Sequence, residues 1–108
     1  MAVKQYPYLL KVLHEEEAVF DQDTAQWIEG QKEWKEFGKC RDEINGSGAN
    51  ITLQDGQKYI FSAVIYSPKN IPEIKKGSKV QVWDGNSLRL EGNVVRFSKE
   101  QLHTRIWL

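Results

Sequence analysis

Apolar and polar residues alternate along much of the chain, with the two-residue period of a β-strand. In KVQVW, Val80 and Val82 are predicted to face a core while their neighbours face outwards. In HTRIWL, Ile106 and Leu108 alternate in the same way with polar or amphipathic residues. The segment 33–44, EWKEFGKCRDEI, alternates in its second half. Each of these segments is therefore predicted to form a strand.

The strongest strand signal lies in ITLQDGQKYIFSAVIYS, residues 51–67. Two strand-prone runs flank QDG, and Asp-Gly is a favoured hairpin turn, so this stretch predicts a hairpin. Both faces of the run from Tyr59 to Tyr66 are apolar, which predicts a central strand. Gly92 interrupts a later strand pattern, where it predicts a bulge or a sharp corner.

The segment from Glu15 to Trp34 shows no sustained period. It is rich in acidic residues, and Gly30 interrupts it. We interpret it as a long acidic loop between the first strands, although DQDTAQWIEG is also compatible with an exposed hairpin arm.

These elements predict an all-β fold, because short strands separated by glycine-rich turns are typical of barrels and sandwiches. A length of 108 residues predicts one domain, residues 1–108. We expect a small single-domain β-barrel, SH3-like or related. The 15 basic and 15 acidic side chains give a net charge of +0 and no global attraction to nucleic acid or membrane. With no apolar run typical of a membrane span or a secretory signal, we expect no membrane partner.

The residues that carry chemistry form no recognisable constellation. His14 and His103 are far apart in the sequence, and a single cysteine provides no zinc pattern. Cys40 is expected to be an inert core thiol. The acids of DQDTAQWIEG lack the glycine and the full ligand series of a calcium loop. We therefore expect no catalytic residues, no metal, no cofactor and no enzymatic activity.

The order of these segments resembles the small β-barrel proteins of tailed-phage necks, the head-closure or head–tail adaptor family. VIYSPKN resembles that family's strand followed by a proline turn. IKKGSKVQV resembles its i-x-x-G-d-x-V strand entry, and LEGNVV resembles its v-x-G-x-V strand. The resemblance covers most of the chain, from about Tyr8 to Leu108.

The resemblance implies a non-enzymatic structural subunit of the virion, assembled in the bacterial cytoplasm. Its implied partners are identical subunits in a ring, the portal or adaptor proteins and the tail proteins, with DNA close by. We expect four apolar residues of the acidic segment to anchor interfaces, where Trp is enriched: Val19, Phe20, Trp27 and Ile28. We expect five carboxylates to face the channel or its rim: Glu15, Glu16, Glu17, Asp21 and Asp23.

A second hypothesis is a cytoplasmic SH3-like or OB-like binding module for peptide or nucleic acid. Aromatic side chains beside basic ones can stack bases. The candidates are Trp27, Trp34, Trp83 and Trp107 with Lys79, Arg89, Arg96 and Arg105. The length of the acidic segment favours the ring-forming subunit, because most connections span 2–6 residues and longer ones tend to be functional.

Overall fold

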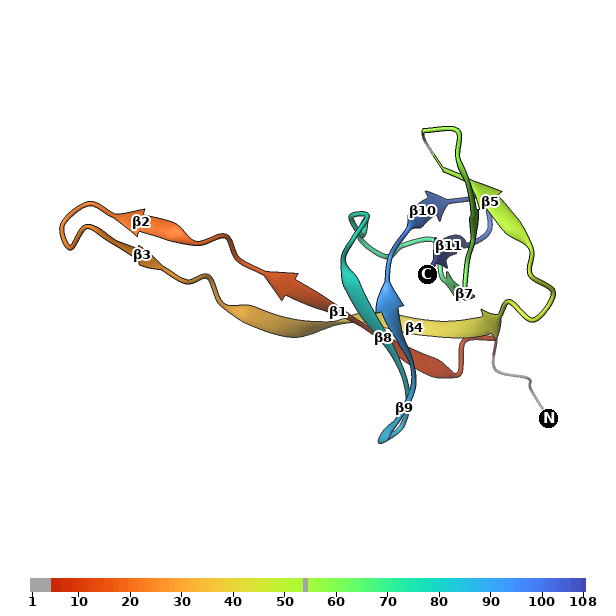
Figure 1. Cartoon of the computed structure of the whole chain (residues 1–108). Coiled ribbons are helices and arrows are strands. Elements are labelled where there is room, and N and C mark those ends of the chain that lie inside the picture. Colours follow the sequence, from red (N-terminus) through yellow and green to blue (C-terminus); the bar gives the residue numbers. More distant parts are fainter. Residues whose placement is uncertain (1–4, 54) are drawn as a thin grey trace.

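A computed structural model describes residues 5–53 and 55–108, and in these residues the chain forms strands and turns with no helix (Figure 1). The all-β prediction is confirmed. The described strands are, in chain order, β1 (Tyr8–Glu15), β2 (Val19–Asp21), β3 (Gln26–Ile28), β4 (Lys32–Ile44), β5 (Asn50–Thr52), β6 (Lys58–Ile60), β7 (Ala63–Ser67), β8 (Lys79–Asp84), β9 (Ser87–Asn93), β10 (Arg96–Lys99) and β11 (Thr104–Trp107).

Seven of these strands form one antiparallel sheet in the order β10-β11-β7-β4-β1-β8-β9. The two edge strands, β9 and β10, are consecutive in the chain and are joined only by Val94 and Val95. The Val94 carbonyl accepts a hydrogen bond from the Gly77 amide at 2.7 Å, and the Val95 amide donates one to the Trp107 carbonyl at 2.8 Å. The sheet therefore curls, and one continuous stretch of chain runs along both of its edges.

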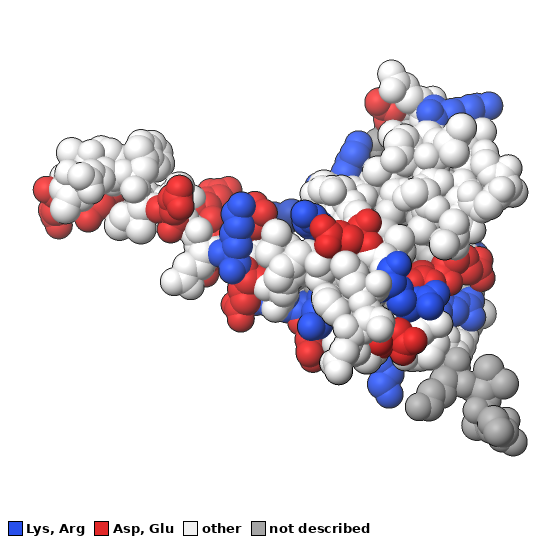
Figure 2. All heavy atoms as spheres, turned by 60° about the horizontal axis from the view of Figure 1, so that its bottom comes forward, with Lys and Arg blue, Asp and Glu red and all other residues white. Residues whose placement is uncertain are grey.

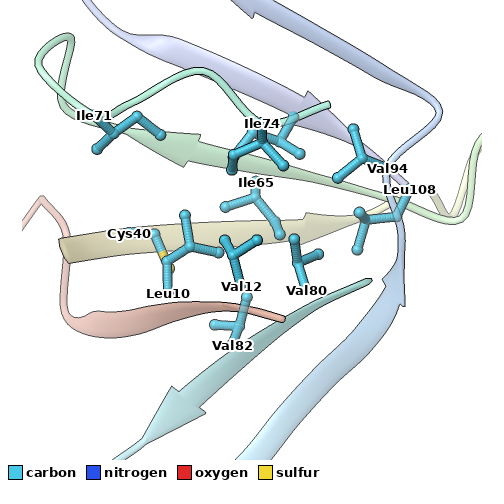
Figure 3. Close-up of a cluster of buried hydrophobic side chains, with 11 residues drawn as sticks. Leu10, Val12, Cys40, Ile65, Ile71, Ile74, Val80, Val82, Val94 and Leu108 are labelled. Carbon is cyan, nitrogen blue, oxygen red and sulfur yellow. The ribbon is translucent and has the colours of Figure 1, made fainter. Parts of the chain in front are cut away.

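The concave side of this sheet holds the hydrophobic core (Figure 3). The core side chains come from β1, β4, β7, β8 and β11 and from the segments that flank them: Leu10, Val12, Cys40, Ile65, Ile71, Ile74, Val80, Val82, Val94, Ile106 and Leu108. The predicted inward positions of β8 and of the last strand are confirmed, because each is buried. Burial of these aliphatic groups is the main stabilising term for a domain of this size.

The predicted central strand is correct in its second half only. β7 lies between β11 and β4, and Ala63 to Ile65 are buried. Tyr59 and Ile60 belong instead to β6, which pairs with β5 in a separate two-stranded ladder and leaves them 37% and 66% exposed. The ladder breaks at Ser62, whose amide donates to the Leu108 carbonyl at 2.7 Å. The predicted 51–60 hairpin is confirmed, although Gln54 of its QDG turn lies outside the described residues.

The prediction of a bulge at Gly92 is wrong. Gly92 pairs regularly with Val80, and the irregular register of this hairpin lies between Val82 and Trp83. A Cβ added at Gly92 would lie 3.3 Å from Cδ1 of Leu108. The glycine therefore makes room for the buried end of the last strand, which packs across the β8–β9 hairpin.

The prediction of a long acidic loop is wrong and its alternative, an exposed hairpin arm, is confirmed, because residues 15–34 form a hairpin. β1 and β4 stay paired out to Glu15 and Lys32, and the Glu16 amide then donates to the Gln31 carbonyl at 2.9 Å. β2 and β3 continue the same hairpin away from the sheet (Figure 1). No core touches this extension, so its strands show none of the apolar alternation by which strands are identified in a sequence.

The projecting hairpin makes the molecule elongated. We name residues 16–31 the arm. The radius of gyration is 16.6 Å, and the principal extents are 60 × 39 × 26 Å. A compact domain of this length has a radius of gyration of about 13 Å. At roughly 3.3 Å per residue, the arm extends about 26 Å beyond the sheet.

Candidate interaction site

The four predicted interface residues gather at one place, the outer part of the arm. Val19 pairs with Ile28, and Phe20 pairs with Trp27. Because neighbouring residues of a strand point to opposite faces, Val19 and Ile28 cover one face of the arm and Phe20 and Trp27 cover the other. We name these four residues the tip. Trp27 does not fold back on the sheet, and the Phe20 and Trp27 rings lie 5.4 Å apart.

The tip is exposed on both of its faces. The exposed fractions are 63% for Val19, 44% for Phe20, 70% for Trp27 and 55% for Ile28. A two-stranded hairpin is at best marginally stable in water, and clustered exposed apolar side chains mark interaction surfaces. A two-faced apolar tip is suited to insertion into another surface, which would cover both faces at once.

The predicted rim carboxylates occupy different positions along the arm and at its base. Glu15 lies 3.9 Å from Lys32 in an exposed ion pair, which contributes little to stability. Glu16 and Glu17 lie between β1 and β2. The Asp21 carboxylate accepts a hydrogen bond from the Asp23 amide at 2.9 Å, so Asp21 shapes the turn of the arm.

The arm as a whole is strongly acidic. Residues 16–31 contain five carboxylates (Glu16, Glu17, Asp21, Asp23 and Glu29) and no Lys, Arg or His. Figure 2 shows an uncharged surface at the end of the arm, bordered by acidic side chains. The arm therefore presents an apolar surface within a negative potential, which favours a partner that is apolar at its centre and basic at its edge.

A groove of about 760 Å³ lies on the body of the protein, beside β1 and β4 and the segment 73–79. Leu13 and Phe37 supply partly exposed apolar lining, and the charged lining comprises two carboxylates, Glu15 and Glu73, and four lysines: Lys35, Lys75, Lys76 and Lys79. Lys79 makes an ion pair of 3.0 Å with Glu91. Among the described residues, no ion pair involves Lys35, Lys75 or Lys76, so three positive charges are available to a ligand.

A row of cationic and aromatic side chains crosses the outer face of the sheet. Tyr66 of β7 pairs with Arg41 of β4 and with Arg105 of β11. The guanidinium carbons of Arg41 and Arg105 lie 4.6 and 5.7 Å from the Tyr66 ring centroid. The sequence does not predict this row, because its members are distant in the chain and only the strand register brings them together.

Two of the candidate tryptophans, Trp83 and Trp107, are poorly placed to stack bases. Trp107 is buried, and the Arg96 guanidinium covers its ring at 5.1 Å. The ammonium of Lys11 lies 5.1 Å from the Trp83 ring. Stacking a base on either ring would first require the cation to move away. These aromatic and basic residues therefore act as internal cation–π pairs of the sheet surface.

Another ion pair ties β9 to the inner part of the sheet. Arg89 donates to both carboxylate oxygens of Asp42, at 3.1 and 2.9 Å. Its guanidinium also lies 4.0 Å from the Tyr8 ring. The hydrogen bond with Asp42 raises the pKa of Arg89. Because Asp42 has a side chain only 5% exposed, this bidentate pair serves to compensate a nearly buried carboxylate.

We expect Cys40 to resist alkylation in the folded protein. Burial raises the pKa of its thiol from 9.0 to about 12, and the nearby Asp42 carboxylate acts in the same direction. At about pH 8 the folded thiol is therefore neutral as well as inaccessible. Mass spectrometry after iodoacetamide treatment should show no modification in buffer and complete modification in concentrated urea. Rapid modification of the native protein would contradict the burial of this thiol.

The remaining candidate residues for chemistry stay apart. Within residues 5–53 and 55–108, no group of three or more His, Cys, Asp and Glu side chains is arranged to hold a metal ion. His14 lies near the end of β1, and His103 Nε2 accepts a hydrogen bond from Arg105 Nε at 3.1 Å. This part of the chain also contains no helix that is long and apolar enough to cross a membrane.

Comparison of the chain with protein-family models, with curated proteins and with solved structures finds no match.

Proposed function

We propose that this protein is a non-enzymatic structural subunit of the head–tail junction of a tailed phage or prophage. The observation that carries the proposal is the arm, which holds an exposed apolar tip about 13–17 Å beyond the end of the sheet. Such an extension allows a subunit of a ring to contact a neighbour. The alternative, a module that binds peptide or nucleic acid on its sheet, gives the arm no role.

The curled sheet supports the resemblance to the small barrels of phage necks. Its edge strands β9 and β10 are joined by two residues, and an SH3-like barrel has one bent strand that belongs to both halves of the sheet. The glycine of LEGNVV, Gly92, lies in β9 two residues before Val94, where it accommodates Leu108. We propose that the fold is a barrel of this kind.

The acidic side chains support a location near DNA without binding to it. Carboxylates repel the phosphate backbone, so DNA slides past an acidic wall with little adhesion. In this proposal the arm carboxylates line the channel or its rim wherever the tip leaves them exposed. The neighbours of the subunit are identical copies and the portal, adaptor and tail proteins.

We expect the double variant Phe20→Ser/Trp27→Ser to fold normally and to abolish the formation of tailed particles. The two side chains lie outside the core, so the free energy of unfolding should change little. The measurement replaces the gene in a lysogen and counts tailed particles by electron microscopy. Leu102→Ser is the matched control, because Leu102 is an apolar side chain that is 82% exposed elsewhere on the surface.

Two outcomes would contradict the proposal in different ways. If the wild-type protein is absent from purified virions, the head–tail function is wrong. If the protein is present and the double variant still yields a normal number of tailed particles, the junction assignment survives and the role of the tip is wrong.

A further inference from the structure

The groove beside β1 and β4 has the chemistry that the tip of the arm requires. Its lining combines the apolar side chains of Leu13 and Phe37 with four lysines, which outnumber the two lining carboxylates, Glu15 and Glu73. The tip combines four apolar side chains with surrounding carboxylates. An apolar centre within a charged rim is the general anatomy of a protein interface, and here the two rims have opposite charge.

The distribution of charge over the whole chain points to the same pairing. The arm, residues 16–31, has a net charge of −5. The other residues hold all 15 Lys and Arg but only 10 of the 15 acids, so the rest of the chain has a net charge of +5. The chain is neutral only because these two parts cancel. An acidic arm is therefore attracted to the body of another copy of the same chain.

The geometry of the molecule excludes docking of the arm into its own groove. The groove includes His14 and Glu15, which lie at the base of the arm, whereas the tip projects away from the sheet (Figure 1). The arm reaches about 26 Å beyond the sheet and its tip lies about 13–17 Å out, at least half of the molecule's shortest extent of 26 Å. One arm is thus long enough to pass from one subunit to the next. Contacts between two different surfaces repeat from copy to copy and generate a ring when the rotation closes.

We propose that the tip of one copy inserts into the lysine-rimmed groove of a second copy, head to tail, so that Lys75 and Lys76 face the carboxylates of the neighbour's arm. This inference rests on the proposed function for its setting, since it supplies the contact between identical subunits. In this inference the partner of the tip is another copy of the same chain and not a portal or tail protein.

The test uses two complementary variants of the full chain. The tip variant, Phe20→Ser/Trp27→Ser, keeps the groove but loses the two aromatic side chains of the tip. The groove variant, Lys75→Glu/Lys76→Glu, keeps the tip but reverses the charge of the groove. Both sets of substitutions lie at exposed positions outside the core. Neither variant alone should self-associate, and a mixture should form a one-to-one dimer with one working contact.

Amide chemical shifts locate the contact. We expect isotope-labelled tip variant, titrated with unlabelled groove variant, to change its shifts in residues 73–79 and around Lys35 and Phe37. In the reverse labelling, the changes should fall on the arm. A chain that carries all four substitutions is the control titrant and should cause no change. Association should be stronger at about 0.1 M than at about 1 M salt, because the charges are screened over shorter distances at higher salt.

Three results would overturn the inference. The first is the absence of shift changes with each protein at about 1 mM. This result would mean that the dissociation constant of the contact is well above about 1 mM. The second is a set of changes centred on another apolar surface, such as Ile44 and Ile60. The third is an equal effect of the control titrant. If any of these is found while the protein is still present in virions, the head–tail function stands and the tip binds a different virion protein.

Discussion

Replacing Ile65 with alanine should lower the free energy of unfolding by about 3 kcal/mol, within the range of about 2–5 kcal/mol found for such core truncations. Ile65 is 0% exposed and belongs to the central core cluster. Its strand, β7, has hydrogen-bonded neighbours on both sides, so the surrounding side chains have little freedom to fill the cavity. A domain of this size has a total stability of only about 5–15 kcal/mol, so this is a large loss.

Ile44→Ala is the matched control for this experiment. It removes the same atoms from the adjacent strand β4, but its side chain is 80% exposed. We expect its effect to remain within about 0.5 kcal/mol. Urea unfolding followed by tryptophan fluorescence measures both variants. Similar midpoints for the two variants would show that β7 is not the centre of the core.

The strands that line the core could be predicted from the sequence because burial leaves a pattern there. Val80 and Val82 alternate with polar residues, since one face of β8 meets the core and the other meets water. The apolar pattern was misleading at Tyr59 and Ile60, which were assigned to the central strand. Both are apolar, and their run continues directly into β7, but a break at Ser62 turns them into a separate hairpin. Such a break depends on a hydrogen bond to the other end of the chain, at Leu108, and no local pattern records it.

The arm could be predicted from the sequence only in part. The sequence predicts its tip residues, because Trp27 and Phe20 are large apolar side chains in an acidic segment. A hairpin there was only an alternative to a loop, because neither face of the hairpin is buried and no period results. The groove could not be predicted at all. Lys35 lies about forty residues before Lys75 in the sequence, and only the fold of the sheet brings them to one cavity.

Replacing Gly30 with alanine should disrupt the hairpin pairing of the arm while leaving the body folded. A Cβ at this position would overlap the carbonyl oxygen of Glu16, on the opposite strand. The obstacle is backbone, so no side chain can rotate away, and the two strands must separate. The hydrogen bond from the Glu16 amide to the Gln31 carbonyl, 2.9 Å long, lies beside this position and should be lost. Since no core residue lies in the arm, the midpoint of urea unfolding should stay close to that of the wild type.

Cross-strand NOEs report this change directly. In the wild type we expect contacts between the backbones of Phe20 and Trp27, which are paired in β2 and β3. In Gly30→Ala these contacts should weaken or disappear, while those between β1 and β8 persist. Gly46→Ala is the control, because a Cβ at Gly46 meets nothing within 4 Å. If the NOEs of the arm survive in Gly30→Ala, the close approach at its base is wrong. If they disappear and particle assembly fails as it does for the tip variant, the arm must be a formed hairpin to act.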